Sequence, residues 1–312
     1  MDRQTENKII LVVRKTRLDD LIARFNTEDQ ARFYVEHLGM DFADYQQEDR
    51  IYDQAVAQAK RILSKYARLQ VVDRSFVPNF IFGPQDTIVA IGQDGLVANV
   101  LKYLDGHPLL GVNPDPERWE GVLLPFAVPD LEMLIPEVFT GSRPVHEVTM
   151  AKVTLNTGET LYGVNDLFIG PQTHTSARYT LTIGGRTERH SSSGIIVSTG
   201  LGSTGWFRSI VAGATGIASA LSGEEIEVDQ PQTFAWDADY LYFSVREPWP
   251  STRSGAEITF GKIYPENPLK LVSQMPENGV IFSDGMEADF LRFNSGSEAT
   301  ITTAERKGQL IA

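Results

Sequence analysis

The chain has 312 residues, a length that suits two packed domains. Its composition, 42% hydrophobic and 22% charged residues, excludes collagen-like, disordered and low-complexity proteins. The 28 Lys and Arg against 41 Asp and Glu leave a net charge of −13, which argues against a nucleic-acid partner. Since there is no cysteine, disulfides, thiolate metal sites and cysteine nucleophiles are excluded.

Targeting and metal-binding signals are also missing from the sequence. The first eight residues, MDRQTENK, are polar and do not resemble a signal peptide. The charge-free, apolar-leaning stretch Ser209–Gly223 is too short to span a bilayer. The five histidines are scattered without zinc-ligand spacing, so no protein metal site is expected. We expect a soluble, cytoplasmic protein with no membrane partner.

Strand and helix signals alternate over the first third of the chain. The expected strands are Lys8–Arg14, Leu69–Val72, Thr87–Ile91 and Pro108–Val112. The expected helices are one that starts at the capping box Thr27–Gln30 and stops at Gly39, then Tyr45–Tyr66 and Leu96–Leu104. Alternation of this kind predicts an open, mostly parallel α/β sheet with helices on both faces.

The pattern changes near residue 120. Gly121–Pro144 contains four prolines and is interpreted as a connector. β signals follow, with a hairpin predicted at the dipeptide Gly184-Gly185. The expected strands are Lys152–Leu155, Leu161–Ile169, Tyr179–Ile183, Arg186–Arg189, Tyr240–Val245, Glu257–Phe260, Leu269–Val272 and Val280–Phe282. We therefore expect an α/β nucleotide-binding domain over 1–125 and a β-rich, β-sandwich-like domain over 126–289.

The first segment with chemical potential is Gly92-Gln93-Asp94-Gly95, between a buried strand and a helix. Ligands of open α/β sheets bind at the carboxyl ends of the strands. Glycines there let a phosphate approach the backbone, and the helix N-terminus favours an anion. Asp94 could accept the proton of an attacking hydroxyl. The simpler alternative is a turn in which Asp94 caps the helix.

A second segment, residues 200–205, spells G-x-G-x-x-G after a strand. The dinucleotide fingerprint of dehydrogenases also requires a second strand ending in an acid, for which Glu224-Glu225 lie at about the right distance. The stretch Ala212–Leu221 between them reads as helix or loop. The loop therefore suits contacts to phosphate or ribose, or forms a tight structural turn.

Two shorter segments place acids beside apolar runs. Asn165-Asp166 lies within the strand-like stretch Leu161–Ile169, where an acid could bind ribose hydroxyls or mark a solvated strand end. Ser283-Asp284-Gly285 follows an apolar run and is typical of a hairpin turn.

In their order along the chain, these segments resemble the NAD kinase family. The resemblance extends over residues 85–290 and is most specific at Ser198-Thr199 with Gly202-Ser203-Thr204. It implies the family's fold, in which the tail, here residues 290–312, packs back on the first domain. It also implies phosphorylation of the adenosine ribose 2′-hydroxyl of NAD, with ATP carrying Mg²⁺.

The resemblance assigns roles to individual residues. Asp94 matches the acid taken as the base for the acceptor hydroxyl. The residues implied to bind nucleotide or phosphate are Gly92, Gln93, Gly95, Asn113, Asn165, Asp166, Thr199, Gly202, Ser203, Thr204, Trp206, Arg246 and Asp284. Trp206 stands where the family has Tyr and could stack on a nicotinamide or adenine ring. Arg246 has the alternative of being a plain surface residue on a solvated strand.

The chain departs from the family pattern at several positions. Gln93 replaces the second glycine of G-G-D-G, and its side chain could obstruct the donor phosphates. Gly200-Leu201 replaces Pro-Thr, and Pro114-Asp115-Pro116 replaces a glycine-rich stretch. These changes indicate a divergent branch.

The function expected from the sequence is an ATP-dependent NAD kinase that forms NADP, as a homo-oligomer of two or four chains. The alternatives are a related kinase with another nucleotide, a sugar or a lipid headgroup as acceptor, and a non-catalytic nucleotide sensor. A dehydrogenase based on residues 200–205 is a further alternative.

Overall fold

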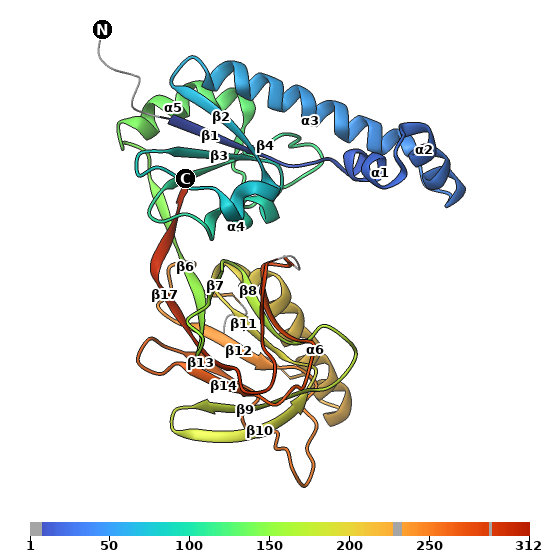
Figure 1. Cartoon of the computed structure of the whole chain (residues 1–312), viewed down its shortest axis with the longest axis vertical. Helices are drawn as coiled ribbons and strands as arrows, with labels where there is room; N and C mark the ends of the chain where they lie inside the picture. The colour runs from blue at the N-terminus through green and yellow to red at the C-terminus, as the bar shows by residue number, and fades with distance from the viewer. Residues whose placement is uncertain (1–7, 227–232, 287–288) are drawn as a thin grey trace. The chain divides into compact units, whose positions relative to one another are not determined.

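The computed structural model describes residues 8–226, 233–286 and 289–312, which form two compact units (Figure 1). The first unit contains the chain up to His146 together with Gln309–Ala312, and the second contains Glu147–Gly308. Residues 1–7, which are most of the polar N-terminal segment MDRQTENK, lie outside the described residues.

The first unit is built on a parallel sheet in the order β2-β1-β3-β4. Its strands are β1 (Lys8–Val13), β2 (Arg68–Asp73), β3 (Thr87–Ile91) and β4 (Pro108–Asn113), with the short β5 (Phe126–Ala127) beside β4. All five residues of β3 are buried, as expected of a strand with helices on both faces. The predicted parallel α/β sheet is therefore confirmed.

The described residues of this unit form five α-helices: α1 (Arg17–Phe25), α2 (Glu28–His37), α3 (Phe42–Leu63), α4 (Asp94–Leu101) and α5 (Leu131–Phe139). The apolar stripe of α3, including Ala55, Ala59 and Ile62, packs with α5 and the sheet in one core. Figure 1 shows α4 on the opposite side of the sheet from α3. Helix α1 was not expected, although Thr16 and Asp19 form a complete capping box at its start.

The interpretation of Gly121–Pro144 as a plain connector is wrong, because it contains α5. Leu131, Leu134 and Ile135 of this helix are fully buried in the core of the first unit. Pro136 is tolerated inside the helix because the carbonyl of Glu132, which would accept the missing N–H, accepts the Tyr66 hydroxyl at 2.8 Å. The first unit therefore extends beyond residue 125.

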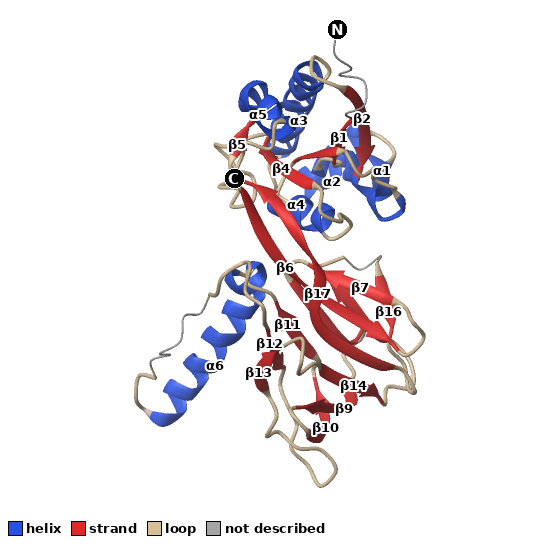
Figure 2. Cartoon of the chain, turned by 90° about the vertical axis from the view of Figure 1, so that its left-hand side faces the viewer, coloured by secondary structure: helices blue, strands red, loops and turns tan. Residues whose placement is uncertain are grey.

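In the part of the second unit that the structure describes, the strands form two antiparallel sheets (Figure 2). One includes β6 (Val145–Leu155), β7 (Thr160–Gly163), β9 (Ala177–Ile183), β10 (Arg186–Ser192), β14 (Leu269–Ser273) and β17 (Glu298–Ile311). The other runs β13-β12-β11-β8-β15-β16, with β8 (Asp166–Pro171), β11 (Ile195–Ser198), β12 (Leu241–Val245), β13 (Phe260–Ile263), β15 (Gly279–Ser283) and β16 (Phe290–Arg292).

Alternate residues of the six-stranded sheet face opposite sides. Leu167 and Ile169 of β8 are buried in a core shared with the first of these sheets, so the predicted sandwich-like packing is confirmed. Phe168 lies on the other face, in a small cluster with Ile196, Val280 and Trp206. Trp206 begins α6 (Trp206–Ser222), which lies beside β12 and β13 (Figure 2).

Two of the expected strands and the expected tail differ from the structure. The run Leu161–Ile169 is not one strand but is divided at Val164-Asn165 into β7 and β8, which belong to different sheets. The strand expected at Glu257–Phe260 starts later, as β13. Of the tail expected to pack on the first unit, residues 290–312, only Gln309–Ala312 belongs to that unit, where Gln309 and Leu310 pair with β4; the described residues before them belong to the second unit. The Gly184-Gly185 hairpin is confirmed, with positive φ at both glycines.

Candidate functional site

In the first unit, Asp94 joins the start of α4 to a neighbouring loop. Its carboxylate accepts hydrogen bonds from the backbone N–H of Leu123 at 2.8 Å and of Val122 at 3.2 Å. The loop approaches this closely because Gly111 of β4 has no side chain: a Cβ there would lie 1.9 Å from the Leu123 carbonyl oxygen. Asp94 is the first residue of α4 and not its cap, so the capping alternative is wrong.

Gln93 is the N-cap residue of α4, and its side chain makes no capping hydrogen bond. Its φ of −121° and ψ of 163° are extended backbone, which any residue adopts without strain. The replacement of a family glycine by Gln93 therefore requires no change of backbone conformation.

The two glycines of this turn have different surroundings. A Cβ at Gly92 would lie 2.9 Å from the Leu96 side chain, which is too close. It would lie 3.5 Å from the Arg14 side chain, which is an ordinary van der Waals contact. Gly95 is exposed, and a Cβ there would meet nothing within 4 Å. Glycine inside a helix costs about 1 kcal/mol relative to alanine. Packing within the described chain therefore gives no reason for glycine at 95, whereas a ligand that approaches the backbone would.

Asn113 lies at the end of β4 and is buried. Its Nδ2 donates to the Trp119 carbonyl at 2.8 Å, and its Oδ1 accepts from the Asp115 N–H at 3.0 Å. Both ends of the amide are thus engaged in the conformation of the loop that follows β4.

In the second unit, the carboxylate of Asp284 holds the turn between β7 and β8. Its Oδ1 accepts hydrogen bonds from the backbone N–H of Asn165 at 2.6 Å and of Asp166 at 3.3 Å, and both of its oxygens contact the N–H of Val164. Asp284 has a φ of +54°, consistent with the turn predicted after β15. Residues 120 positions apart in the chain are thereby brought together.

The carboxyl group of Asp166 lies in this turn without a hydrogen bond to any described residue. Burial, and then the negative charge of Asp284, raise the pKa of Asp166 to about 7. A buried carboxyl without compensation destabilises the ionised fold. Groups of this kind are concentrated at functional sites, where a ligand supplies the missing partner.

The loop that spells G-x-G-x-x-G packs against the same turn. The hydroxyl of Thr199 donates to the Val164 carbonyl and accepts from the Gly202 N–H at 3.2 Å. A Cβ at Gly202 would lie 1.9 Å from the Asn165 carbonyl oxygen, so glycine is required there for close packing. The hydroxyl of Ser203 donates to the Gly200 carbonyl at 2.6 Å, whereas Thr204 is exposed.

This arrangement differs from a dehydrogenase fingerprint. Strand β11, which precedes the loop, pairs antiparallel with both β8 and β12. A dinucleotide fingerprint joins a strand of a parallel sheet to its crossover helix. The dehydrogenase alternative for residues 200–205 is therefore wrong.

Trp206 and Arg246 lie side by side at the boundary of two cavities. The Trp206 ring stacks on Phe168, with centroids 6.0 Å apart and planes 7° from parallel. The Arg246 guanidinium lies 5.6 Å from the Trp206 ring centroid, which excludes a purely solvated Arg. Both residues line a cavity of about 800 Å³ beside α6 and another of about 370 Å³ beside β15.

The structure therefore brings the expected residues together in three groups. The first is the Gly92–Gly95 turn, with Asn113 on the neighbouring strand of the same sheet. The second is the turn at Asp166. Its members are Asn165, Asp166, Thr199, Gly202, Ser203 and Asp284. The third is Trp206 with Arg246. Sequence reasoning missed Phe168, although the alternation in β8 places it on the opposite face from Leu167 and Ile169.

Within the described residues, no helix is long and apolar enough to cross a membrane. The same part of the chain contains no group of three or more His, Cys, Asp or Glu side chains that could hold a metal ion.

Comparison with known proteins reveals similarity of structure. No protein-family model matches the chain, and no curated protein matches it in sequence. A solved structure of an NAD kinase from Archaeoglobus fulgidus in complex with ATP is similar, with a TM-score of 0.57 and 15% identity over 98% of this chain and 93% of that one. A yeast NADH kinase complexed with NADH gives a TM-score of 0.55 and 14% identity over 98% and 83% of the two chains. The resemblance seen in the sequence is thus confirmed at the level of the fold.

Proposed function

Since the chain has the fold of the NAD kinases, we propose that it transfers the γ-phosphoryl group of ATP to the adenosine ribose 2′-hydroxyl of NAD, forming NADP. The observation that carries the proposal is the half-buried carboxyl of Asp166, which has no hydrogen-bond partner among the described residues and lies in a cluster of nucleotide-type loops. Such a group is costly to the fold and is accounted for by a ligand with hydroxyl donors.

Asp94 acts as the base in this proposal. A carboxylate offers about four lone-pair positions, so the two backbone donors at Val122 and Leu123 leave room for a third hydrogen bond. Phosphoryl transfer depends mainly on positioning and charge neutralisation. Asp94 orients the acceptor hydroxyl and takes its proton. Mg²⁺ bound to ATP would neutralise phosphate charge and would need few protein ligands.

The acceptor is recognised in the second unit. Asp166 accepts hydrogen bonds from ribose hydroxyls, with Asn165 beside it. The flat Trp206 ring and the Arg246 guanidinium line both cavities. They suit an aromatic base and a phosphate respectively. These groups together match the chemistry of a dinucleotide.

The direct test is formation of NADP from NAD and ATP by the purified protein, detected with a dehydrogenase specific for NADP. The same assay is repeated with NADH, with sugar phosphates as acceptors and with polyphosphate as donor. Thermal midpoints are measured with each ligand, because a ligand that binds the folded state raises the midpoint. Stabilisation by NAD without turnover would favour a sensor, and turnover of a sugar phosphate would replace NAD as the acceptor.

We also propose that the active form is a homo-oligomer of two or four chains acting in the cytoplasm. Sedimentation equilibrium of the purified protein measures the number of chains, and a monomer at assay concentration with full activity would contradict it.

The substitution Gly95→Ala distinguishes the effect of this glycine on stability from its effect on ATP affinity. Alanine is the better helix former, so the free energy of unfolding is expected to rise by about 0.5–1 kcal/mol. The new methyl group occupies the open side of the turn, so the affinity for ATP is expected to fall severalfold. Denaturant unfolding and calorimetric titration with ATP measure the two effects.

The matched control is Gly216→Ala, in the exposed part of α6, where a Cβ also meets nothing within 4 Å. It should gain similar stability and leave ATP affinity unchanged. Unaltered ATP affinity in Gly95→Ala would remove Gly95 from the proposed site.

A further inference from the structure

Arg14 is the first residue after β1 and lies beside the Gly92 turn. In the parallel pairing of β1 with β3, Val12 is opposite Ala90, so two further residues along each strand bring Arg14 opposite Gly92. A Cβ at Gly92 would lie 3.5 Å from Arg14 Cδ and 3.6 Å from Arg14 Nε. The Arg14 side chain therefore lies at the carboxyl edge of the sheet, where α4 begins.

The Arg14 side chain is buried, with 10% of its surface exposed. Its Nη2 donates to Glu48 Oε1 at 2.9 Å, and its Nη1 donates to the Lys15 carbonyl at 2.8 Å. Its Nε is also buried but has no acceptor among the described residues. A buried donor without an acceptor destabilises a fold, so this N–H group calls for a partner that the described chain does not supply.

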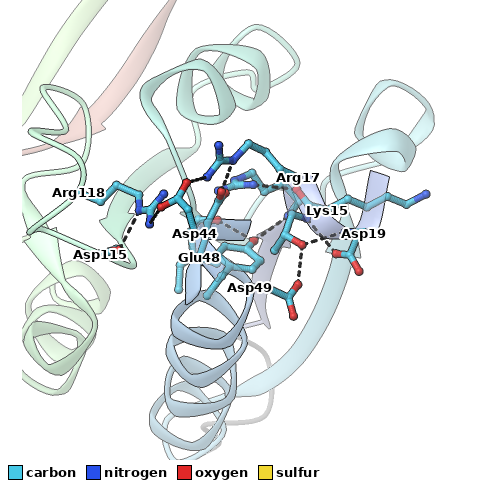
Figure 3. Close-up of polar contacts among 12 residues, drawn as sticks. Lys15, Arg17, Asp19, Asp44, Glu48, Asp49, Asp115 and Arg118 are labelled. Carbon is cyan, nitrogen blue, oxygen red and sulfur yellow. Dashed lines mark hydrogen bonds and ion pairs between the residues drawn. The ribbon is translucent and has the colours of Figure 1, made fainter. Parts of the chain in front are cut away.

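Glu48 fixes the orientation of Arg14. One of its carboxylate oxygens accepts from Arg14 and the other from Arg17. Arg17 and Arg118 both bind Asp44, and Arg118 also pairs with Asp115 (Figure 3). The hydrogen bonds from Arg118 and Arg17 lower the pKa of Asp44 to about 2, so this carboxylate remains charged near neutral pH.

This chain of ion pairs contains three guanidinium and three carboxylate groups. It holds Arg14 through Nη2, while Nη1 is held by the Lys15 backbone carbonyl and Nε is left without an acceptor. The nearest acid of the turn, Asp94, has its carboxylate bonded to the loop at Val122 and Leu123. The first N–H groups of α4 lack partners within the helix and favour an anion at the same edge.

We infer that Arg14 binds the polyphosphate of the phosphoryl donor through its unpartnered Nε–H, beside Gly92 and the start of α4. Guanidinium N–H groups form short, charge-assisted hydrogen bonds to phosphate oxygens, and the guanidinium keeps its charge at every physiological pH. Glu48 is a positioning residue that holds Arg14 toward the turn. The inference rests on the proposed function for the identity of the donor.

The test compares Arg14→Met with Arg118→Met. Each variant loses one guanidinium of the same ion-pair chain, but Arg118 lies after β4 and is bound to Asp44 and Asp115. Calorimetric titration with inorganic tripolyphosphate, with Mg²⁺-ATP and with NAD measures the three affinities. Arg14→Met is expected to weaken tripolyphosphate and ATP at least 10-fold and NAD less than twofold, whereas Arg118→Met changes each less than twofold.

If Arg14→Met does not fold, Arg14→Lys is tested in its place. The lysine keeps a positive charge beside Glu48, which favours folding, and lacks the guanidinium Nε–H group. It should also weaken tripolyphosphate severalfold, with the thermal midpoint as the check on folding. Wild-type affinity for tripolyphosphate in a folded Arg14 variant would overturn the inference, as would an equal loss in Arg118→Met.

The same titrations distinguish this inference from the proposed function. Arg14-dependent binding of tripolyphosphate by a protein that does not phosphorylate NAD would support the inference and reject the acceptor. NADP formation by an Arg14→Met variant with unchanged donor affinity would reject the inference alone. A wild-type protein that binds neither ATP nor tripolyphosphate would reject both.

Discussion

Asp94→Asn is expected to reduce turnover of NAD by about 10²–10⁴, the usual contribution of a positioned general base. The amide keeps the size and polarity of the side chain but takes up no proton from the acceptor hydroxyl. One of its two ends also presents N–H groups to the backbone donors of Val122 and Leu123. We therefore expect an additional loss of about 1–3 kcal/mol in the free energy of unfolding, from the unsatisfied donor.

Turnover is measured at saturating NAD and ATP, at a temperature at which the variant is folded, and dinucleotide affinity is measured separately. Asp115→Asn serves as the control, since it makes the same chemical change in the loop after β4 and contacts Arg118 instead. Its turnover should remain within twofold of wild type. If Asp94→Asn retained activity within a few-fold, Asp94 would be a structural link between α4 and the loop and nothing more.

Asp166→Asn is expected to change stability and affinity in opposite directions. In the unfolded chain an Asp has a pKa near 3.9, whereas burial and Asp284 raise the folded pKa to about 7. Well below about pH 4 the Asp166 carboxyl is protonated in both the folded and the unfolded state, so it does not lower the free energy of unfolding. As the pH rises from 4 to 7 the unfolded state ionises first, so the wild type loses stability over this window. At pH 8 the variant should therefore be more stable, by up to about 4 kcal/mol.

The affinity for NAD should fall in the same variant by about 1.5–3 kcal/mol, the range for a hydrogen bond to a charged group. Denaturant unfolding at pH 4 and pH 8 and calorimetry with NAD measure both quantities. Asp237→Asn, an exposed position in the same unit, is the control and should change stability by about 0.5 kcal/mol or less. A variant that lost stability and kept its NAD affinity would show that Asp166 serves the fold.

Local sequence signals were sufficient for much of the secondary structure. The apolar run of β3 and the Gly184-Gly185 hairpin were predicted at their observed positions, because buried strands and two-residue turns depend on neighbouring residues. The helix α5 was missed because four prolines normally indicate a connector, and its stability comes from core contacts and from the Tyr66 hydroxyl that satisfies the Glu132 carbonyl.

The candidate residues, too, were identified from local chemistry: an acid between glycines, an acid in an apolar run, and a loop of small residues. The different roles of these residues could not be identified in the same way. Asp284 and Asp166 are both acids at strand ends, and only the contact between them reveals that one holds three backbone N–H groups while the other remains without a partner.

The sequence by itself thus determined the parallel and antiparallel halves of this protein and the chemistry of its loops, since periodicity and turn residues act over a few positions. The tertiary structure alone decided which glycines serve packing and which stay open. Gly202 faces the Asn165 carbonyl and Gly95 faces nothing, although the two residues look alike in the sequence. It also placed Arg14 beside Gly92, 78 positions away in the chain, because strand register is set by the burial of whole faces of a sheet and not by any single residue.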